Sequence, residues 1–564
     1  MKFTSMNKIF SMLAVFLFIG SMAFAQPKKE EVPNNWFQLD PATSGYAGIS
    51  LDKARELLKS KNLKSHRVIV AVIDSGIDTT HTSLKPILWT NPGEIPGNGI
   101  DDDKNGYIDD VHGWNFIGGK DGRNVKDDSY EAARVFYALK DKWENKTIDE
   151  NTLNTNDKAE YATYKRAKEK VQGDVNENEV AFLRQLKPRF AKGDSIIRKE
   201  LGKEEYACKD LKDFSTQNAD AKVTKSILMG FCQGNKSDDI SNQQLLDYID
   251  GEIRKADAAT HAPENFRGDI VKDNENDIND RYYGNNDIMA NTPFHGTFCA
   301  GIIAGVKGTN PESITGIADN VRIMAVRAVP DGDEHDKDIA LAIRYAVDNG
   351  AKIISMSFGK DFSPEKKWVD DAFKYAESKG VLLVHAAGND HKNIDTAYNF
   401  PNPIYADGSG RASNIITVGA SSDKKLGSAL ADFSNYGKKE TDVFAPGVSI
   451  YSTTPFNNSF GKSNGTSFAG PIVAGIAALT LQYYPNLTPQ QLKTIIEKTA
   501  QAPAGKVNKP GSDEMVSLSD ISVSGGIVDA YEAVKYAGDM QKPMLKHKDK
   551  KRLPKSKISK PVKG

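Results

Sequence analysis

The sequence predicts an α/β fold in which a mainly parallel sheet is flanked by helices in three layers. Five short runs rich in apolar residues are typical of strands buried on both faces. These runs are 68–73, 321–329, 351–358, 380–388 and 415–420. Amphipathic helical patterns stand between them, for example at 336–350 and 366–380. Because strands that alternate with helices form parallel sheets covered on both faces, these observations together predict the fold class.

The start of the chain has the layout of a secretory signal. Lys2 and Lys8 precede an apolar run that ends at Ala23-Phe24-Ala25, the small-residue pattern of a cleavage site. We expect a signal peptide over 1–25, cleavage after Ala25, and an exported product that is periplasmic or secreted. The run is shorter than the roughly 20 residues of a membrane helix, and no second such run follows, so we expect no stable membrane span. An uncleaved anchor is the alternative.

Composition narrows the class of protein. The 564 residues are 26% charged and 39% hydrophobic, with a formal net charge of −1, which is typical of a soluble globular chain. No long basic stripe occurs before the last few dozen residues, so nucleic acid is not an expected partner. With only three cysteines the chain is not a disulfide scaffold. Cys208 and Cys232 either pair or stay reduced, and the sequence does not decide between the two.

The chain divides into four predicted parts after the signal. Residues 26–63 form a polar N-terminal arm with one short helix in "ISLDKARELLKS", and 64–535 form the main domain. Residues 120–285 interrupt that domain as a largely helical insertion, because they lack buried-strand runs. Residues 541–564 carry nine lysines and one aspartate, which predicts a disordered, solvated tail. Binding of the tail to an acidic surface is the alternative.

Four polar residues stand where a parallel sheet places its site, beyond the carboxyl ends of the strands. Asp74 and Asn389 follow strand runs, whereas His295 and Ser467 begin helical runs. Each alone fits a turn or a helix cap. Together they supply what acyl transfer by a serine requires: a nucleophile, a base, an acid that orients the base, and an oxyanion donor.

The segments around these residues resemble those of a known family. "VIDSGID", "HGTFCAGIIAG", "AAGN" and "NGTSFAGPIVAG" are similar, in content and order, to the signature segments of the subtilisin-like serine peptidases (subtilase family, peptidase S8). The resemblance implies a subtilisin-like fold and an endopeptidase that cleaves protein or peptide substrates through an acyl-enzyme. By resemblance, Asp74 orients, His295 is general acid and base, Ser467 attacks, and Asn389 donates to the oxyanion.

The resemblance also implies two walls of a substrate groove, one of which pairs with the substrate as an added β-strand. The implied substrate-binding residues are Ser357, Phe358, Gly359, Ala386, Ala387 and Gly388. The sequence departs from the family at Phe298 and Phe468, where a histidine and a methionine are usual. Cys299 resembles a cysteine that some members keep beneath the histidine, which implies sensitivity to thiol reagents. A small buried core residue is the alternative reading of Cys299.

The insertion separates Asp74 from His295 much further than is usual in the family. It either gates the groove, binds a protein partner, or elaborates the surface. The arm at 26–63 is too short for the usual folding pro-domain. Maturation therefore requires either signal removal alone or folding assistance from the arm or the insertion.

An acidic stretch near residue 100 predicts a calcium loop. Asp101, Asp103, Asn105 and Asp109 stand at positions one, three, five and nine, with Gly106 at the turn, which is the oxygen-ligand spacing of such loops. Position twelve is His112, so the stretch is not an EF-hand. Many subtilisin-like proteins bind structural Ca²⁺, and we expect it here without a part in the chemistry. A self-bonded Asx turn is the alternative, and 273–287 is a weaker candidate.

Two other readings of the function stay open at this point. A catalytically silent subtilisin-like binding protein is expected to have lost one of the four site residues, and all four are present. A narrow processing protease or peptide ligase differs from a general protease only in its pockets. The sequence does not determine substrate preference.

Overall fold

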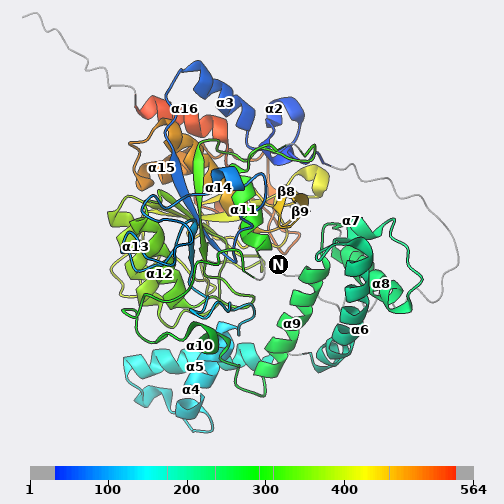
Figure 1. Ribbon diagram of the computed structural model, residues 1–564. Coiled ribbons are helices and arrows are strands. Elements are labelled where there is room, and N and C mark those ends of the chain that lie inside the picture. Colours follow the sequence, from blue (N-terminus) through cyan, green and yellow to red (C-terminus); the bar gives the residue numbers. More distant parts are fainter. Residues whose placement is uncertain are drawn as a thin grey trace, which may run out of the picture.

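The structure is a computed structural model that describes residues 32–173, 176–235, 237–290, 293–308, 310–456 and 458–541 (Figure 1). The predicted signal peptide at 1–25 lies outside the described residues. So does the predicted basic tail, apart from its first residue, Gln541. Within these ranges, none of the helices has both the length and the apolar character that crossing a membrane requires.

A seven-stranded parallel sheet forms the centre of the molecule. Its strand order is β2-β3-β1-β4-β5-β6-β7. The strands are β1 (Val68–Asp74), β2 (Gly113–Asn115), β3 (Val321–Arg327), β4 (Ile353–Met356), β5 (Leu382–Ala386), β6 (Ile415–Ser421) and β7 (Val443–Pro446). All five predicted runs form strands. The edge strands β2 and β7 were not predicted, because three or four residues are too few to show a pattern.

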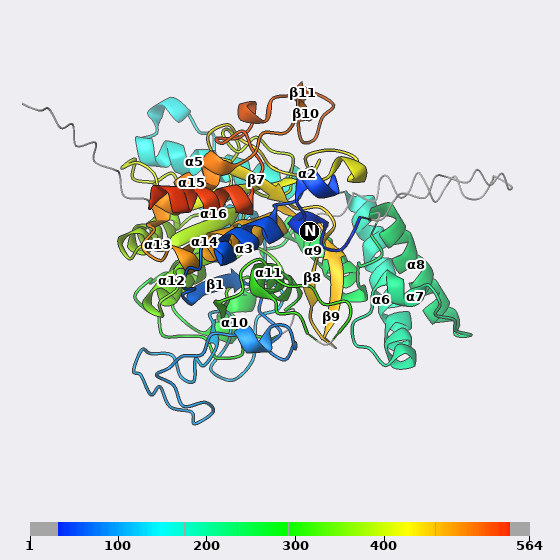
Figure 2. The same ribbon diagram turned by 90° about the horizontal axis from the view of Figure 1, so that it is seen from above.

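Helices cover both faces of the sheet, which confirms the three-layer α/β prediction. One core cluster lies between the sheet and a layer of five helices, and a second lies on the opposite face. The first layer holds α3 (Leu51–Ser60), α11 (Phe294–Ala304), α14 (Thr466–Tyr483), α15 (Pro489–Thr499) and α16 (Ala530–Met540). The second holds α12 (Asp336–Asp348) and α13 (Lys366–Ser378). Figure 2 shows α3, α14 and α16 lying together.

The N-terminal segment is part of the core, which corrects the prediction of a polar arm. Trp36 and Phe37 are 0% exposed, and both belong to the cluster beneath the first helical layer. The Trp36 indole N–H donates to the carbonyl oxygen of Ser449 at 3.1 Å. The short helix α2 (Pro41–Ser44) and the predicted α3 follow. The adjacent aromatic residues Trp36 and Phe37 in an otherwise polar stretch could have indicated this burial from the sequence.

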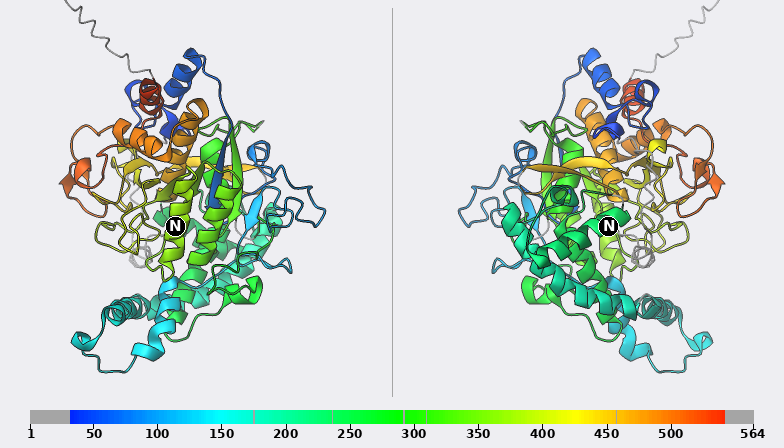
Figure 3. Two further views of the ribbon diagram at one scale, coloured as in Figure 1. Left: turned by 90° about the vertical axis from the view of Figure 1, so that its left-hand side faces the viewer. Right: turned by 90° about the vertical axis from the view of Figure 1, so that its right-hand side faces the viewer.

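The insertion is largely helical between residues 131 and 271. Its helices are α4 (Glu131–Trp143), α5 (Thr155–Gly173), α6 (Glu177–Leu201), α7 (Cys208–Leu211), α8 (Ala219–Asn235), α9 (Asn242–Ala258) and α10 (Phe266–Val271). Figure 1 shows α4, α5, α9 and α10 beyond the carboxyl ends of the strands. Both views in Figure 3 show these helices in the lower part of the molecule.

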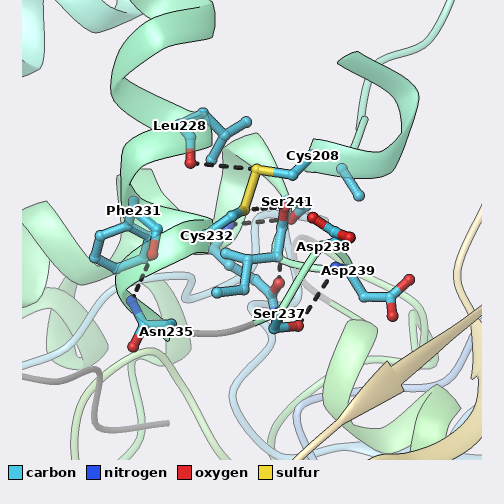
Figure 4. Close-up of a disulfide and its surroundings, with 12 residues drawn as sticks. Cys208, Leu228, Phe231, Cys232, Asn235, Ser237, Asp238, Asp239 and Ser241 are labelled. Carbon is cyan, nitrogen blue, oxygen red and sulfur yellow. Dashed lines mark hydrogen bonds between the residues drawn. A yellow bond between two sulfur atoms is a disulfide. The ribbon is translucent and has the colours of Figure 1, made fainter. Parts of the chain in front are cut away.

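Two hydrophobic clusters divide the insertion into a hairpin of α4 and α5 and a lobe of α6 to α9. In the lobe, Phe190, Leu228 and Ile249 are 0% exposed. A disulfide joins Cys208 to Cys232 within it (Figure 4), which resolves the question that the sequence left open. The flanks of the insertion do not separate from the main domain, because Val125 and Val271 belong to the second core cluster of the sheet.

Two antiparallel pairs complete the described fold. One is formed by β8 (Ile450–Thr454) and β9 (Ser459–Ser463), and the other by β10 (Val507–Asn508) and β11 (Met515–Val516). The first pair contacts α11 through hydroxyl groups. Ser452 Oγ and Thr453 Oγ1 donate to carbonyl oxygens of α11, each at 2.8 Å. These bonds fix α11, the helix whose second residue is His295.

Candidate active site

The four predicted polar residues all stand at element ends on one edge of the sheet. Asp74 is the last residue of β1, and Asn389 follows the end of β5 by three residues. His295 and Ser467 are each the second residue of a helix, α11 and α14 respectively. Parallel strands present their carboxyl ends at the same edge, and helices that run back along the sheet begin there.

Asp74 and His295 are in direct contact. His295 Nδ1 lies 2.8 Å from Oδ1 and 2.9 Å from Oδ2 of Asp74. The carboxylate is 3% exposed and also accepts the backbone N–H of Ser75 at 2.7 Å. Gly296 makes this contact possible, because a Cβ there would lie 2.2 Å from the carbonyl oxygen of Gly76. The glycine after the histidine therefore lets α11 approach the end of β1.

The backbone of Ser467 is held at the start of α14. Its carbonyl oxygen accepts from Ser357 Oγ at 2.8 Å and from Cys299 Sγ at 3.4 Å. Its own hydroxyl donates to the carbonyl oxygen of Ser357 at 3.3 Å, a long and therefore weak hydrogen bond. The side chain is half-buried. The hydroxyl can thus change partner without disturbing the helix start.

Thr466 fixes the orientation of the Asn389 side chain. The Asn389 Oδ1 atom accepts from the backbone N–H and from Oγ1 of Thr466, each at 2.9 Å. Thr466 Oγ1 in turn accepts the backbone N–H of Gly388 at 3.1 Å. With the carbonyl side of the amide engaged in this way, its NH₂ group is the side available to an incoming oxyanion. Sequence reasoning quoted Thr466 within "NGTS" but assigned it no role.

The two departures from the family pattern, Phe298 and Phe468, pack against each other. Their ring centroids are 4.5 Å apart, and the Phe468 ring lies 5.5 Å from the His295 ring. Both side chains are buried, with Phe298 0% and Phe468 3% exposed. The two rings form an apolar surface beside the imidazole of His295. The sequence did not predict this contact, because the two residues are 170 positions apart and only the fold brings their rings together.

Cys299 lies beneath the histidine. Its sulfur is 4.0 Å from His295 Nδ1, and the residue is 0% exposed. Burial, together with the nearby Asp74 charge, raises the pKa of the Cys299 thiol. Because the thiolate is the reactive form of cysteine, these surroundings favour an inert core thiol. Sensitivity to thiol reagents stays a prediction.

The two predicted substrate walls lie next to Ser467. Ser357 and Phe358 are buried, with 7% and 9% of each residue exposed, whereas Gly359 is exposed. The carbonyl oxygen of Phe358 lies 2.8 Å from His385 Nε2. On the other wall, Ala387 donates its backbone N–H to Val418. The substrate-binding role of all six predicted residues stays a prediction.

The opposite wall also has a position that only glycine fits. Gly388 has a φ of +102°, and a Cβ there would lie 2.4 Å from Asn435 Nδ2. The Asn435 amide also donates to the carbonyl oxygen of Ala387 at 2.9 Å. Asn435 therefore supports the turn that leads into Asn389. It carries no motif of its own, and the sequence offered no signal for it.

The acidic loop groups its carboxylates differently from the predicted calcium spacing. Glu94, Asp101 and Asp103 each offer a carboxylate oxygen, and these atoms lie within 4.8 Å of one another. Asp109 instead accepts the backbone N–H groups of Gly97 and Gly99, each at 2.8 Å. Glu94 and Asp101 also accept backbone N–H groups of this stretch. The calcium-binding role of Asp101, Asp103, Asn105 and Asp109 stays a prediction.

Asn105, the remaining predicted ligand, lies between neighbouring carboxylates. Its Nδ2 atom donates to Asp103 at 3.2 Å and to Asp110 at 3.1 Å. Its Oδ1 atom accepts the backbone N–H of Tyr107 at 2.8 Å. Burial raises the pKa of the Asp110 carboxyl to about 6. Asn105 thus links the carboxylate group to the core of the loop.

The amino-acid sequence is similar to a family model and to several known proteins. Residues 65–518 match the family model described as "Subtilase family". The chain is 40% identical over 212 residues to the "Thermophilic serine proteinase" of Bacillus sp. (strain AK1), which covers 37% of this chain and 48% of that protein. It is 35% identical over 210 residues to "Subtilisin DY" of Bacillus licheniformis, covering 36% and 70%. It is 35% identical over 273 residues to "Thermitase" of Thermoactinomyces vulgaris, covering 47% and 86%. The chain thus spans about half the length of the first of these relatives and most of the third.

Proposed function

The chain belongs to the subtilase family of serine peptidases, and from this premise we propose that it is an exported endopeptidase with Ser467 as nucleophile. Its substrates are proteins or peptides, and the reaction passes through an acyl-enzyme. The observation that carries the proposal is the contact between His295 and the buried Asp74, which is formed where the end of β1 meets the start of α11. Ser467 stands at the start of α14.

His295 acts as general base and then as general acid. Because its Nδ1–H is held by Asp74, Nε2 is the nitrogen that takes the proton of the Ser467 hydroxyl. The serine oxygen then attacks the scissile carbonyl carbon, and the imidazolium gives the proton to the leaving amine. Water enters by the same route and hydrolyses the ester, which returns the proton to Ser467. Asp74 stays ionised and stabilises the imidazolium throughout.

Asn389 and the backbone N–H of Ser467 stabilise the oxyanion of each tetrahedral intermediate. The support for Asn389 is the pair of hydrogen bonds from Thr466 to its Oδ1. A donor that is oriented before the substrate binds needs no reorganisation when charge develops on the carbonyl oxygen. The Ser467 N–H is available because the first N–H groups of a helix have no partner within it.

We also propose a structural Ca²⁺ in the acidic loop, with Glu94, Asp101 and Asp103 as the residues that would hold it. Three converging carboxylates are the oxygen ligands that this hard cation prefers. Backbone N–H groups of the loop donate to all three carboxylates and hold them in this arrangement. Bound Ca²⁺ would supply a cross-link of the loop and no step of the reaction.

Labelling with an active-site phosphonate tests the proposed activity. Purified full-length wild type is expected to form a covalent adduct at Ser467, located by peptide mass spectrometry, and Ser467→Ala is expected to form none. The control is Ser378→Ala, which changes an exposed serine at the end of α13. Folded wild type that takes no label would favour a catalytically silent binding protein.

Cell fractionation tests the proposed export. The full chain is expected outside the cytoplasm with Gln26 as its new N-terminus, whereas a chain without residues 1–25 is expected to stay inside. N-terminal sequencing of the exported product distinguishes cleavage from an uncleaved anchor. Recovery of the intact N-terminus in the cytoplasm would contradict the proposal.

A further inference from the structure

The hairpin of α4 and α5 is attached to the chain that follows β4. We propose that this hairpin is a fixed support of the substrate segment, defined as Ser357–Gly359, with Lys360 and Arg166 as its positioning residues. The inference rests on the proposed function, because the substrate segment has a role only if peptides bind there. The inference also argues against the role of the insertion as a gate of the substrate groove, because a fixed support does not open and close.

The first attachment is a buried ion pair. Lys360 directly follows the substrate segment, and its Nζ lies 2.7 Å from Glu131 Oε2 at the start of α4 and 2.9 Å from Asp336 Oδ1. The three side chains are only 2%, 6% and 5% exposed. Nζ also donates to the carbonyl oxygen of Glu334 at 2.7 Å. Separating buried charges costs several kcal/mol, so α4 does not swing away from Lys360.

The second attachment is apolar. Phe362, two residues beyond Lys360, is 3% exposed and belongs to the hydrophobic cluster of the hairpin. Its partners there include Phe136 of α4 and Tyr164 of α5. The chain leaving the substrate segment is therefore inserted into the core of the hairpin. Movement of the hairpin would expose Phe362 or pull the segment with it.

The third attachment joins α5 to the two chain segments that flank the substrate segment. The guanidinium carbon of Arg166 on α5 lies 4.3 Å from the ring centroid of Phe362 and 3.4 Å from that of Tyr398. The Tyr398 ring stacks on Phe400. Phe400 in turn pairs with Lys360 through two backbone hydrogen bonds, each 2.9 Å. Arg166 thus connects both chain segments that meet beside Gly359.

These attachments have one consequence for recognition. The carbonyl oxygen of Phe400 lies 3.0 Å from the place of a Cβ on Gly359, so a shift of either segment moves the backbone with which a peptide would pair. Displacements of about 1 Å far from the reacting atoms can reduce the rate by about 10²-fold. The acylation of Ser467 itself does not use the hairpin. Loosening it should therefore harm long substrates more than short ones.

The test compares two substrates with the same P1 residue. One is a short activated ester, which acylates Ser467 without lying along the substrate segment, and the other is a peptide of six or more residues. For Lys360→Met and Arg166→Leu in the full chain, kcat/KM for the peptide should fall by about 10- to 100-fold, with most of the change in KM. The value for the ester and the rate of phosphonate labelling should stay at the wild-type level.

Matched controls come from the same hairpin. Lys142→Met removes two ion pairs between α4 and α5, made by a lysine side chain that is 48% exposed. Lys165→Leu changes a side chain that is 46% exposed and stands next to Arg166 in the sequence. Both should cleave both substrates like wild type. If Lys360→Met does not fold, Arg166→Leu decides the question, because its guanidinium packs on the exposed ring of Tyr398.

Two results would overturn the inference. One is a parallel loss for ester and peptide, which indicates a general structural defect, and the other is unchanged peptide cleavage in both variants. A wild-type protein that cleaves neither substrate and takes no phosphonate would instead contradict the proposed function. The two failures are therefore distinguishable.

Discussion

The Nδ1 atom of His295 lies within 2.9 Å of both carboxylate oxygens of Asp74. The two residues are brought together by the end of a central strand and the start of a buried helix. The contact fixes which ring nitrogen faces the carboxylate and which remains for a reacting proton.

Replacing Asp74 by asparagine should leave the fold intact and almost abolish turnover. The amide favours the wrong imidazole tautomer, and losses of about 10⁴-fold in kcat are expected for such a change. Steady-state cleavage of a peptide substrate measures it. Asp52→Asn, at a side chain 83% exposed, is the control, and a loss of less than tenfold in Asp74→Asn would argue against the assigned role.

Removing the Asn389 amide should lower kcat by about 10²–10³-fold with little change in KM, because the donor acts on the oxyanion and not on the bound substrate. Thr466→Val should lower kcat in the same direction and by less. It removes one of the two hydrogen bonds that orient the amide. Kinetics with a single peptide substrate compare the two variants. If Thr466→Val changes KM alone, the orienting role is wrong.

Phe298 and Phe468 should be energetically coupled. Each change to alanine is expected to lower the free energy of unfolding by about 3–5 kcal/mol, since both rings are buried. The double variant should cost less than the sum, by about 0.5–1.5 kcal/mol, because the ring contact is lost only once. Urea denaturation of wild type, the two single variants and the double variant measures this coupling as a double-mutant cycle. Strict additivity would mean that the contact contributes nothing.

His335 should make stability fall as the pH rises above neutral. Burial and the Arg134 charge lower the pKa of His335, but its hydrogen bonds to Asp128 and Glu275 outweigh them and raise it above the usual 6.5. The folded state then holds the proton more tightly than the unfolded state. This stabilisation is complete below about pH 6.5 and is lost as the pH rises through the pKa of the folded protein.

Denaturation of wild type and His335→Gln between pH 5 and pH 9 measures this slope. The variant should be less stable at low pH and should show a flatter profile. Glu334 contributes a slope of the same sign, because burial raises the pKa of its carboxyl to about 8, so Glu334→Gln is the comparison variant. Parallel profiles for wild type and His335→Gln would rule out the histidine as the source.

Chelation should lower the melting temperature if Ca²⁺ occupies the acidic loop. Glu94→Gln and Asp101→Asn should weaken Ca²⁺ binding measured by calorimetry, because both side chains belong to the converging group. Asp109→Asn should destabilise the loop and lower Ca²⁺ affinity less than the other two changes, because its carboxylate is outside the converging group and holds Gly97 and Gly99. A melting temperature that chelation leaves unchanged would remove the calcium proposal.

The sequence by itself determined the five inner strands of the sheet and the positions of the four polar residues at element ends. Apolar runs such as 68–73 are local signals, because a strand buried on both faces must be apolar at every position. The ends of these runs indicated Asp74 and Asn389, and the small-residue patterns after His295 and Ser467 indicated helices that pack closely on the sheet. The match to the subtilase family over residues 65–518 agrees with that reading.

Only the tertiary structure decided which distant side chains meet. It buried Trp36 in the core, grouped Glu94 with Asp101, and paired Phe298 with Phe468 beside the histidine. It also joined Lys360 to Glu131 across the boundary of the insertion. Local patterns report the burial and direction of a segment. Contacts between segments depend on how the elements pack, and no periodicity within either segment encodes them.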